Sequence, residues 1–262
     1  MARMTTPEDG SLPAFQKTIP TVHRLDHSQA QRVLWALEEL HASNGLKYHY
    51  KNYPRVQPKN PDLLEVSPLG KSPILTVEDL KGRPVPNIQV VDGVVMETQL
   101  ILEFLGESYG GKDLWEPETA EERLRDRYFR SFATGTMVER VDQAMLFTAL
   151  PKLMPFPLKQ IFGLLFIPLE KAFRAYLVDF FDFMESQLSV ELPYFAGKKL
   201  GIADFCLEFP MSMAVCQGFL DGKKYPKIRA WHDTITSREA YKKAIEKGGG
   251  KEKYDLVSFG AK

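Results

Sequence analysis

One stretch in the first half of the chain, residues 68–75, reads PLGKSPIL. It leads into an apolar segment, residues 73–77, whose composition is typical of a β-strand. Proline occupies the first position of this segment, where a sheet tolerates the missing N–H group. We therefore expect a strand that starts at Pro73, and the elements around it decide which kind of sheet this strand joins.

Strand and helix patterns alternate before this point. From Ser28 onward the apolar residues recur at helical spacing, and Ser28 with Gln31 has the spacing of a capping box, which predicts the helix start. Asn44-Gly45 predicts the end of this helix. The elements expected here are a strand at residues 21–26, a helix at 28–44, a strand at 46–53 and a short helix within 58–66.

Two more elements follow Pro73 and its strand. We expect a strand at residues 88–91, after a turn that contains Gly and Pro, and a helix from Glu97 to Tyr109. The order is then βαβαββα, a βαβ unit joined to a ββα unit. This is the thioredoxin-like arrangement, in which helices cover a mixed sheet.

The second half of the chain shows only helical patterns, which predicts a helical bundle. The helices are expected at residues 118–150, 161–188, 202–219 and 228–245. The fold class is therefore α/β plus all-α. The predicted parts are a flexible extension at 1–20, a thioredoxin-like domain at 21–110, a linker at 111–117, a helical domain at 118–247 and a tail at 248–262.

The composition excludes several classes of protein. The 34 basic and 34 acidic residues cancel, so the basic excess that is usual in nucleic-acid-binding proteins is missing. Cys206 and Cys216 are too few for a disulfide framework, and their spacing is no zinc motif. His23 and His27 lie on a strand and a loop, so we expect no metal site. The N-terminus lacks a signal-peptide pattern, which favours the cytoplasm.

Residues 145–169 are unusually apolar and contain four prolines. Lys152 and Lys159 interrupt the segment, and its longest uncharged piece, residues 160–169, is much shorter than a membrane-spanning helix. We interpret it as a buried or interfacial helix broken by prolines. Contact with a membrane surface is possible here, but not spanning.

Five short segments resemble motifs of the glutathione transferases, most closely of their fungal serine-type branch. They are residues 26–34 (DHSQAQRVL), 68–75, 96–101 (METQLI), 197–204 (GKKLGIAD) and 225–231 (YPKIRAW). The resemblance covers about residues 21–247. It implies the two-domain fold, a homodimer, and glutathione as co-substrate with no metal or nucleotide cofactor.

Ser28 is the candidate for activating the glutathione thiol. The N–H groups and dipole at a helix start favour a thiolate, and a serine hydroxyl can donate a hydrogen bond to it. In serine-type members the activating serine precedes an arginine at the spacing seen here between Ser28 and Arg32. The alternative is a plain helix cap. His27 occupies about the position of the nucleophile in cysteine-type members, and it is either a second candidate or a polar loop residue.

The resemblance implies that Pro73 follows a cis peptide bond. Ser72 would then turn its backbone N–H and C=O groups toward the cysteinyl part of glutathione. Lys71 would suit the glycyl carboxylate, with Lys59 as another candidate, and the alternative for both lysines is an ordinary surface charge.

Glu97 and Thr98 stand at the start of the last helix of the first half. The Thr98 hydroxyl and the N–H groups there can hold the γ-glutamyl carboxylate, and Glu97 can pair with its ammonium. The alternative is that Thr98 caps the helix while Glu97 favours its dipole.

The implied function is a glutathione transferase that adds the thiolate to an electrophilic, largely apolar small molecule, as in detoxification. Phe132, Met137 and Arg140 are the candidates for the second-substrate pocket. One alternative is a glutathione-dependent double-bond isomerase of fungal secondary metabolism, for which residues 145–169 could build the substrate pocket. Another is a non-catalytic binding or regulatory module with the same fold.

Overall fold

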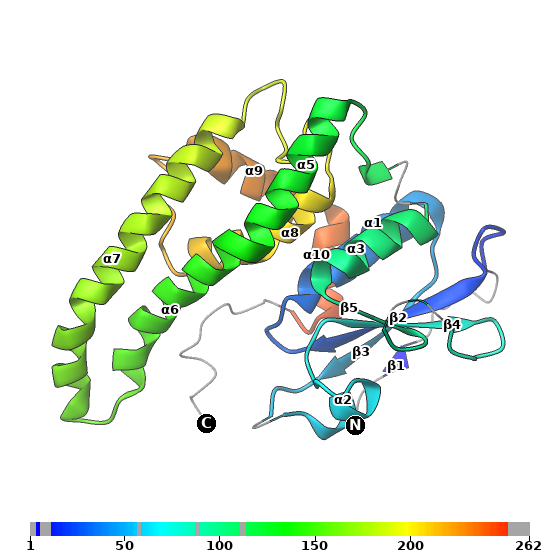
Figure 1. The fold of residues 1–262 in the computed structure, drawn as a ribbon, viewed down its shortest axis with the longest axis horizontal. Coiled ribbons are helices and arrows are strands. Elements are labelled where there is room, and N and C mark those ends of the chain that lie inside the picture. The colour runs from blue at the N-terminus through cyan, green and yellow to red at the C-terminus, as the bar shows by residue number, and fades with distance from the viewer. Residues whose placement is uncertain are drawn as a thin grey trace. The chain divides into compact units, whose positions relative to one another are not determined.

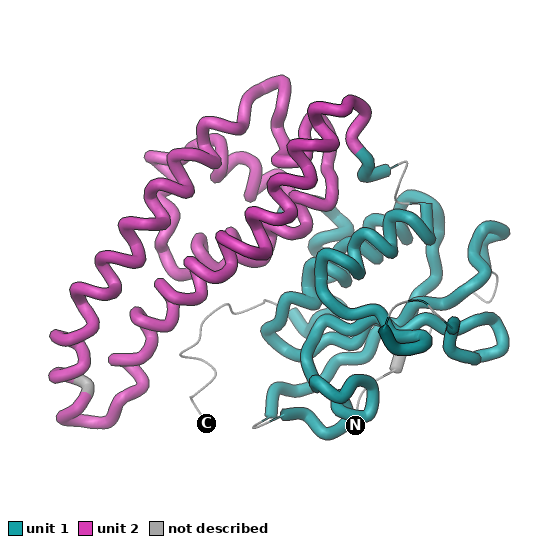
Figure 2. Tube along the Cα trace, in the orientation of Figure 1, with its two compact units in different colours: residues 1–116, 236–252 teal, residues 117–235, 253–262 magenta. Residues whose placement is uncertain are grey.

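The computed structural model describes residues 4–5, 12–56, 59–86, 88, 90–110 and 114–250 of the chain. The chain separates into two units (Figure 2), residues 1–116 with 236–252, and residues 117–235 with 253–262. The first unit holds the sheet, and the described residues of the second form helices and loops. This confirms the predicted combination of an α/β part with an all-α part.

The two units differ from the predicted domains near the end of the chain. Helix α10 (Glu239–Lys247) belongs to the first unit, although the sequence places it in the helical domain at 118–247. The single helix expected at 228–245 is broken at Arg238, whose backbone is extended between α9 (Pro226–Ser237) and α10. A helical period is a local signal and does not show which neighbour a helix packs against.

Five strands form one mixed sheet in the order β1-β3-β2-β4-β5. They are β1 (Met4–Thr5), β2 (Thr18–Leu25), β3 (His49–Tyr53), β4 (Ile74–Asp79) and β5 (Val94–Met96). The central strand β2 pairs in parallel with β3 and antiparallel with β4, and the edge strands β1 and β5 are antiparallel to their neighbours. The expectation of a loose extension at 1–20 is wrong in part, because β1 and the start of β2 lie within it.

The strand expected at residues 88–91 is wrong. On the side away from β2, β4 pairs with β5 (Val94–Met96), while Val90 is 88% exposed and residue 89 lies outside the described residues. Gly93 has a φ of 71°, and a Cβ atom there would lie 2.7 Å from the Cβ atom of Pro84. Glycine alone fits this close turn without strain, and the carbonyl of Gly93 accepts from the Val77 N–H in β4 over 2.8 Å, directly before β5 begins.

Three helices flank the sheet (Figure 1). Helices α1 (Ala30–Asn44) and α3 (Thr98–Ser108) lie on one face, and the short α2 (Pro61–Val66) lies on the other. Gly45 ends α1 with a φ of 78°, as predicted. The predicted start is wrong, since α1 begins at Ala30 with Gln29 at the N-cap, and the capping box expected for Ser28 does not form.

Helix α1 is enclosed on all sides, because α10 packs on the side that the sheet and α3 leave open. Every residue from Ala30 to Leu40 is buried. Glu38 and Glu39 are among them, and each is paired with a cation from the end of the chain. Arg238 donates to Glu39 over 2.8 Å, and the Lys247 ammonium pairs with Glu38. Removing one partner of such a buried pair would leave a charge without compensation.

The second unit is a bundle that contains one long hairpin. Its helices are α5 (Ala120–Phe132), the π-helical turn η1 (Ala133–Met137), α6 (Val138–Leu153), α7 (Leu158–Gln187), α8 (Ile202–Cys216) and α9. Helices α6 and α7 lie side by side, joined by residues 154–157 (Figure 1). The buried Asp204 accepts hydrogen bonds from the Phe195 backbone and the Trp231 indole, over 2.9 and 2.8 Å, which ties α8 to α9.

A histidine links three strands of the sheet. The Nδ1 atom of His23 in β2 lies 2.7 Å from the Tyr53 hydroxyl in β3, and Nε2 lies 3.0 Å from the Thr76 hydroxyl in β4. The side chain is buried, and this burial, with a smaller effect of the Lys51 charge, lowers the pKa of His23 to about 4. The imidazole is therefore neutral at physiological pH.

We predict that His23 makes the free energy of unfolding fall with acidity. Between its ordinary pKa of 6.5 and the folded value of about 4, the unfolded chain binds a proton that the folded chain does not. The loss should develop as the pH falls through this window and reach at most about 3 kcal/mol. Urea unfolding at pH 7 and pH 5 should show a smaller pH dependence for His23→Gln than for the parent. An equal dependence in both proteins would contradict the prediction.

Candidate functional site

A cleft with a volume of about 160 Å³ opens in the first unit. The loop before β4, the junction of β5 with α3, and the residue ahead of α1 form its walls. The lining residues are Gln29, Leu69, Lys71, Ser72, Pro73, Ile74, Met96, Glu97 and Thr98. Five of the residues predicted for ligand binding are thus brought together from two segments that are distant in the sequence, Lys71, Ser72, Pro73, Glu97 and Thr98.

A second hollow, of about 250 Å³, lies in the second unit between the residues around Leu188 and helix α9. Its lining is mainly apolar, and Lys227 is the one ionisable side chain that it contains. It is larger than the cleft of the first unit, but it lacks the converging polar groups of a catalytic site.

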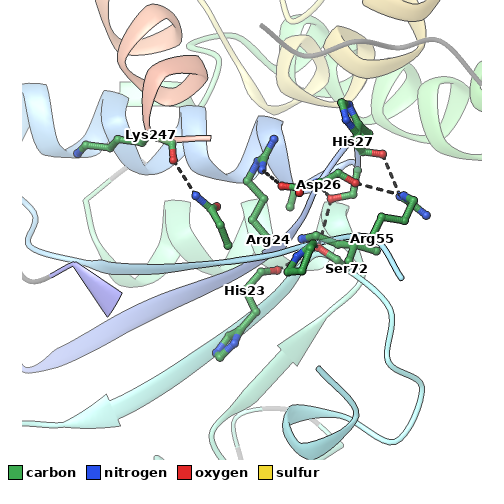
Figure 3. Close-up of polar contacts among 12 residues, drawn as sticks. His23, Arg24, Asp26, His27, Arg55, Ser72 and Lys247 are labelled. Carbon is green, nitrogen blue, oxygen red and sulfur yellow. Dashed lines mark hydrogen bonds and ion pairs between the residues drawn. The ribbon is translucent and has the colours of Figure 1, made fainter. Parts of the chain in front are cut away.

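Ser72 anchors the wall of the cleft (Figure 3). Its hydroxyl donates to the His23 carbonyl and accepts from the Leu25 N–H, each over 3.0 Å, so the loop is tied to the end of β2. The Ser72–Pro73 peptide bond is cis, as the resemblance implies. The backbone N–H and carbonyl of Ser72 make no hydrogen bond with the described part of the chain. They remain available to a peptide-like ligand.

Glu97 holds an unusual backbone conformation at the edge of the cleft. Its φ is 68°, in a region where a residue with a side chain is strained. It directly precedes the first turn of α3, and no side chain caps this helix end. The N–H groups of the first turn therefore remain open to an anion.

The cleft offers a charge of each sign. Among the described residues, no ion pair or hydrogen bond engages the carboxylate of Glu97 or the ammonium of Lys71. Both side chains are exposed, so a ligand can reach them. A small zwitterionic or peptide-like molecule would match these groups together with the start of α3.

Ser28 does not line the cleft. Its Oγ atom is 3.3 Å from the Ser72 Oγ atom and accepts from the Ala30 N–H over 3.3 Å. The residue is 6% exposed. In this structure the Ser28 hydroxyl therefore supports the start of α1, one side chain away from the open cleft.

His27 and Lys59 do not line the cleft either. His27 has a φ of 52°, and its carbonyl accepts from the Arg55 guanidinium over 3.0 Å (Figure 3). The same guanidinium donates to the Asp26 carbonyl over 3.3 Å, so Arg55 clamps the turn between β2 and α1. Lys59 is exposed and precedes Asn60, which caps α2.

Gln29 is a site residue that the sequence reasoning missed. It lines the cleft, and its side-chain oxygen accepts from the Thr98 hydroxyl over 3.4 Å and from Arg32. The sequence places the helix start at Ser28. In the structure α1 begins at Ala30, so the residue at the helix start that lines the cleft is Gln29 and not Ser28. A correct prediction of the helix start would have pointed to Gln29.

The three candidates for a second-substrate pocket all lie in the second unit. Met137 is fully buried, and Phe132 is 9% exposed within a group of aromatic rings. Arg140 places its guanidinium 5.7 Å from the centre of the Tyr176 ring and donates to Gln143 over 3.0 Å. Among these three, Arg140 is the residue whose side chain is partly exposed to solvent.

Comparison with known proteins adds to this geometry. The family model described as "Glutathione S-transferase, N-terminal domain" matches residues 28–108, and the one for the C-terminal domain matches residues 172–239. "Glutathione S-transferase 1" of Saccharomyces cerevisiae is 30% identical over 234 residues, which cover 86% of this chain and 94% of the yeast protein. The chain belongs to the glutathione transferase family.

Other glutathione transferases resemble it over a similar length. "Glutathione S-transferase 3" of Schizosaccharomyces pombe is 26% identical over 86% of each chain. An epsilon-class glutathione S-transferase of the housefly is 22% identical, with a TM-score of 0.66 over 92% of this chain and 98% of that one. A glutathione transferase of Phanerochaete chrysosporium, solved with oxidized glutathione, is 20% identical, with a TM-score of 0.64 over 89% and 96% of the chains. These structures share the fold.

This glutathione transferase thus carries a small-molecule cleft in its thioredoxin-like unit. The described residues contain no group of three or more His, Cys, Asp or Glu side chains that could hold a metal ion. The chemistry of the cleft comes from a carboxylate, an ammonium, two helix starts and exposed backbone groups.

We predict that Glu97→Gly stabilises the protein. The backbone strain at φ 68° costs a non-glycine residue about 1 to 3 kcal/mol, part of which the larger chain entropy of unfolded glycine offsets. The free energy of unfolding in urea should rise by about 1 kcal/mol in Glu97→Gly, and it should not rise in Glu97→Ala, which keeps the strain. If the two variants are equally stable, the strain at this position is negligible.

Proposed function

We propose that the cleft binds glutathione and that the enzyme adds its thiolate to an electrophilic, largely apolar small molecule. One observation carries the proposal. A free carboxylate, the open start of α3 and the unpaired backbone of Ser72 converge in one cleft of the first unit. Glutathione carries matching groups at matching positions along its length.

Each part of glutathione has a partner in the proposal. Glu97 pairs with the γ-glutamyl ammonium, and the Thr98 hydroxyl with the α3 N–H groups holds the neighbouring carboxylate. The Ser72 backbone pairs with the cysteinyl amide in a short β-like contact, beside Pro73. Lys71 takes the glycyl carboxylate, and Lys59, on the exposed loop before α2, is the alternative.

In the proposal, the start of α1 activates the glutathione thiol. Its partial positive charge stabilises a thiolate and so lowers the pKa of the thiol. Ser28 would donate its hydroxyl hydrogen to the sulfur, which requires the hydroxyl to turn from its present contact with Ser72. Gln29, whose amide lines the cleft, offers a second N–H donor. The thiolate forms a bond from sulfur to the electrophilic carbon, and the leaving group departs with the electron pair of its own bond.

Two related structures support this assignment. One glutathione transferase of Phanerochaete chrysosporium was solved with oxidized glutathione, and another was co-crystallized with 1-(S-glutathionyl)-2,4-dinitrobenzene. The second compound is the product of a thiolate attack on an aromatic carbon. Both proteins are 20% identical to this chain, so they support a ligand class for the shared fold and do not identify the natural substrate.

Several finer points stay predictions. They are the homodimer, the cytoplasmic location, a role in detoxification, and contact of the second substrate with Phe132, Met137 or Arg140. An isomerase would use the same thiolate but release it again, so the mass of the product separates the two reactions: conjugation adds glutathione, and isomerisation leaves the mass of the substrate unchanged.

We predict that calorimetric titration of glutathione shows binding that depends on Glu97. Glu97→Gln removes a charge-assisted hydrogen bond, so the dissociation constant should rise about tenfold to a hundredfold. Glu107→Gln is the matched control, because Glu107 is an exposed carboxylate on the same helix, α3. Binding should be unchanged in this control. No binding by the parent protein would overturn the proposed function.

We predict that Ser28→Ala alters the pH dependence of kcat/KM with 1-chloro-2,4-dinitrobenzene. In the parent, the rise of kcat/KM with pH should have its midpoint below 8.5, which is about the value for an unperturbed thiol. In Ser28→Ala this midpoint should move up toward that value, and the rate at pH 6.5 should fall about tenfold to a hundredfold.

The shape of the pH profile separates catalysis from folding. A lower rate with an unchanged midpoint, accompanied by a lower free energy of unfolding, would mean that Ser28 only supports the start of α1. The same pH profile of kcat/KM for Gln29→Ala tests whether the Gln29 amide is a second hydrogen-bond donor to the thiolate.

A further inference from the structure

The apolar segment 145–169 forms the end of the α6–α7 hairpin in the second unit, which we call the hairpin tip (Figure 1). Its inner face is closed by phenylalanine rings. The ring of Phe147 in α6 lies 5.7 Å from that of Phe166 and 4.7 Å from that of Phe173, measured between ring centres. Phe162 stacks on Phe166 at 5.7 Å. The two helices therefore hold each other through these aromatic contacts.

The outer face of the hairpin tip consists of large apolar side chains in contact with solvent. The exposed fractions are 80% for Phe156, 75% for Leu164, 61% for Leu165, 59% for Ile161, 45% for Leu153 and 44% for Leu146. Ile161, Leu164 and Leu165 stand at the spacing of one helix face. Isolated exposed apolar residues are ordinary, but six large ones at one end of a hairpin indicate an interaction surface.

The charged residues within the sequence of the hairpin tip have one sign. Residues 143–169 include Lys152 and Lys159 and no Asp or Glu, and the nearest carboxylates in the sequence are Asp142 and Glu170. An exposed apolar helix face favours the interface of a bilayer, and lysines in the same segment favour a bilayer that carries negative charge. The lysines add attraction to the lipid headgroups, while the aliphatic face enters the boundary of the acyl chains.

Two other occupants fit less well. If a second copy related by two-fold symmetry set the hairpin tip against itself, its lysines would come together with no carboxylate from the same segment to pair with them. A second copy that met the tip with another surface is an outcome of the light-scattering measurement below. Spanning is excluded for the described residues, since none of their helices is both long and apolar enough to cross a membrane. In α7 charged residues return from Glu170 onward.

We propose that the hairpin tip is a peripheral membrane-binding surface that inserts its outer aliphatic face into the interface of an anionic lipid bilayer. The proposal does not depend on the proposed catalytic function, because none of the residues assigned to the cleft lies in the tip.

The test is co-sedimentation of the full-length protein with vesicles. One set of vesicles contains phosphatidylcholine alone, and the other contains phosphatidylcholine mixed with phosphatidylserine. The parent should sediment with the mixed vesicles more than with the neutral ones, and added salt should reduce this difference. Lys152→Gln/Lys159→Gln should lose most of the preference for the anionic vesicles.

The apolar part of the surface is tested by Leu164→Gln/Leu165→Gln, which should lower the partition coefficient at least about tenfold. Phe156→Ser, in the loop between the helices, provides an independent variant. The matched control is Leu124→Gln/Val190→Gln, because these residues are 66% and 93% exposed in the same unit but lie outside the tip. This control should bind vesicles like the parent.

Three results would overturn the proposal. The first is a parent protein that stays in the supernatant with both kinds of vesicle. The second is a control that loses as much binding as the leucine variant, which would indicate non-specific adsorption. The third is a lower molecular mass of Leu164→Gln/Leu165→Gln in light scattering, which would make the tip a contact between copies of the chain.

Discussion

The cleft depends on one side chain, the hydroxyl of Ser72, which replaces a strand partner at the end of β2. It accepts from the Leu25 N–H and donates to the His23 carbonyl, so both backbone groups are satisfied without a further strand. The loop before β4 is thereby fixed, while the backbone N–H and carbonyl of Ser72 stay open. A buried backbone group left unpaired costs about 1 to 3 kcal/mol, so the serine at this position stabilises the fold and also shapes the site.

A second constraint lies behind the cleft, in helix α1. The residue ahead of α1 contributes to the site, and the helix is held in place by contacts from the far end of the chain. Glu38 and Glu39 are buried, and Lys247 and Arg238 compensate their charges. Trp35 meets the Tyr241 ring edge-on at 5.4 Å. The position of the proposed thiol-activating helix start is thus coupled to the C-terminal helix α10.

In the hairpin tip, some of the apolar residues hold the two helices together and others are exposed to solvent. A helix that is apolar on all sides is normally buried on all sides. In the α6–α7 hairpin the rings of Phe147, Phe166 and Phe173 meet between the helices, while other large apolar residues, such as Leu164 and Phe156, are exposed to solvent. Of the two interpretations of 145–169, a fully buried helix is therefore wrong for these residues, because the described part of the chain does not cover them.

Local signals in the sequence determined much of this protein. The helical period located the main helices, Gly45 marked the end of α1, and motif resemblance brought Lys71, Ser72, Pro73, Glu97 and Thr98 into one group. These features depend on residues close in sequence, whose backbone preferences and spacing can be interpreted without the fold. The family and fold class followed from the same segments.

Tertiary structure alone decided the rest. The position of β5 depends on the close approach of Gly93 to Pro84. Helix α10 belongs to the first unit because it packs against α1. Gln29 lines the cleft because α1 starts at Ala30. Each outcome comes from a contact between segments far apart in the chain, or from a helix end that such contacts adjust. Periodicity carries no information about these partners, since the energy that selects them arises only when distant surfaces pack together.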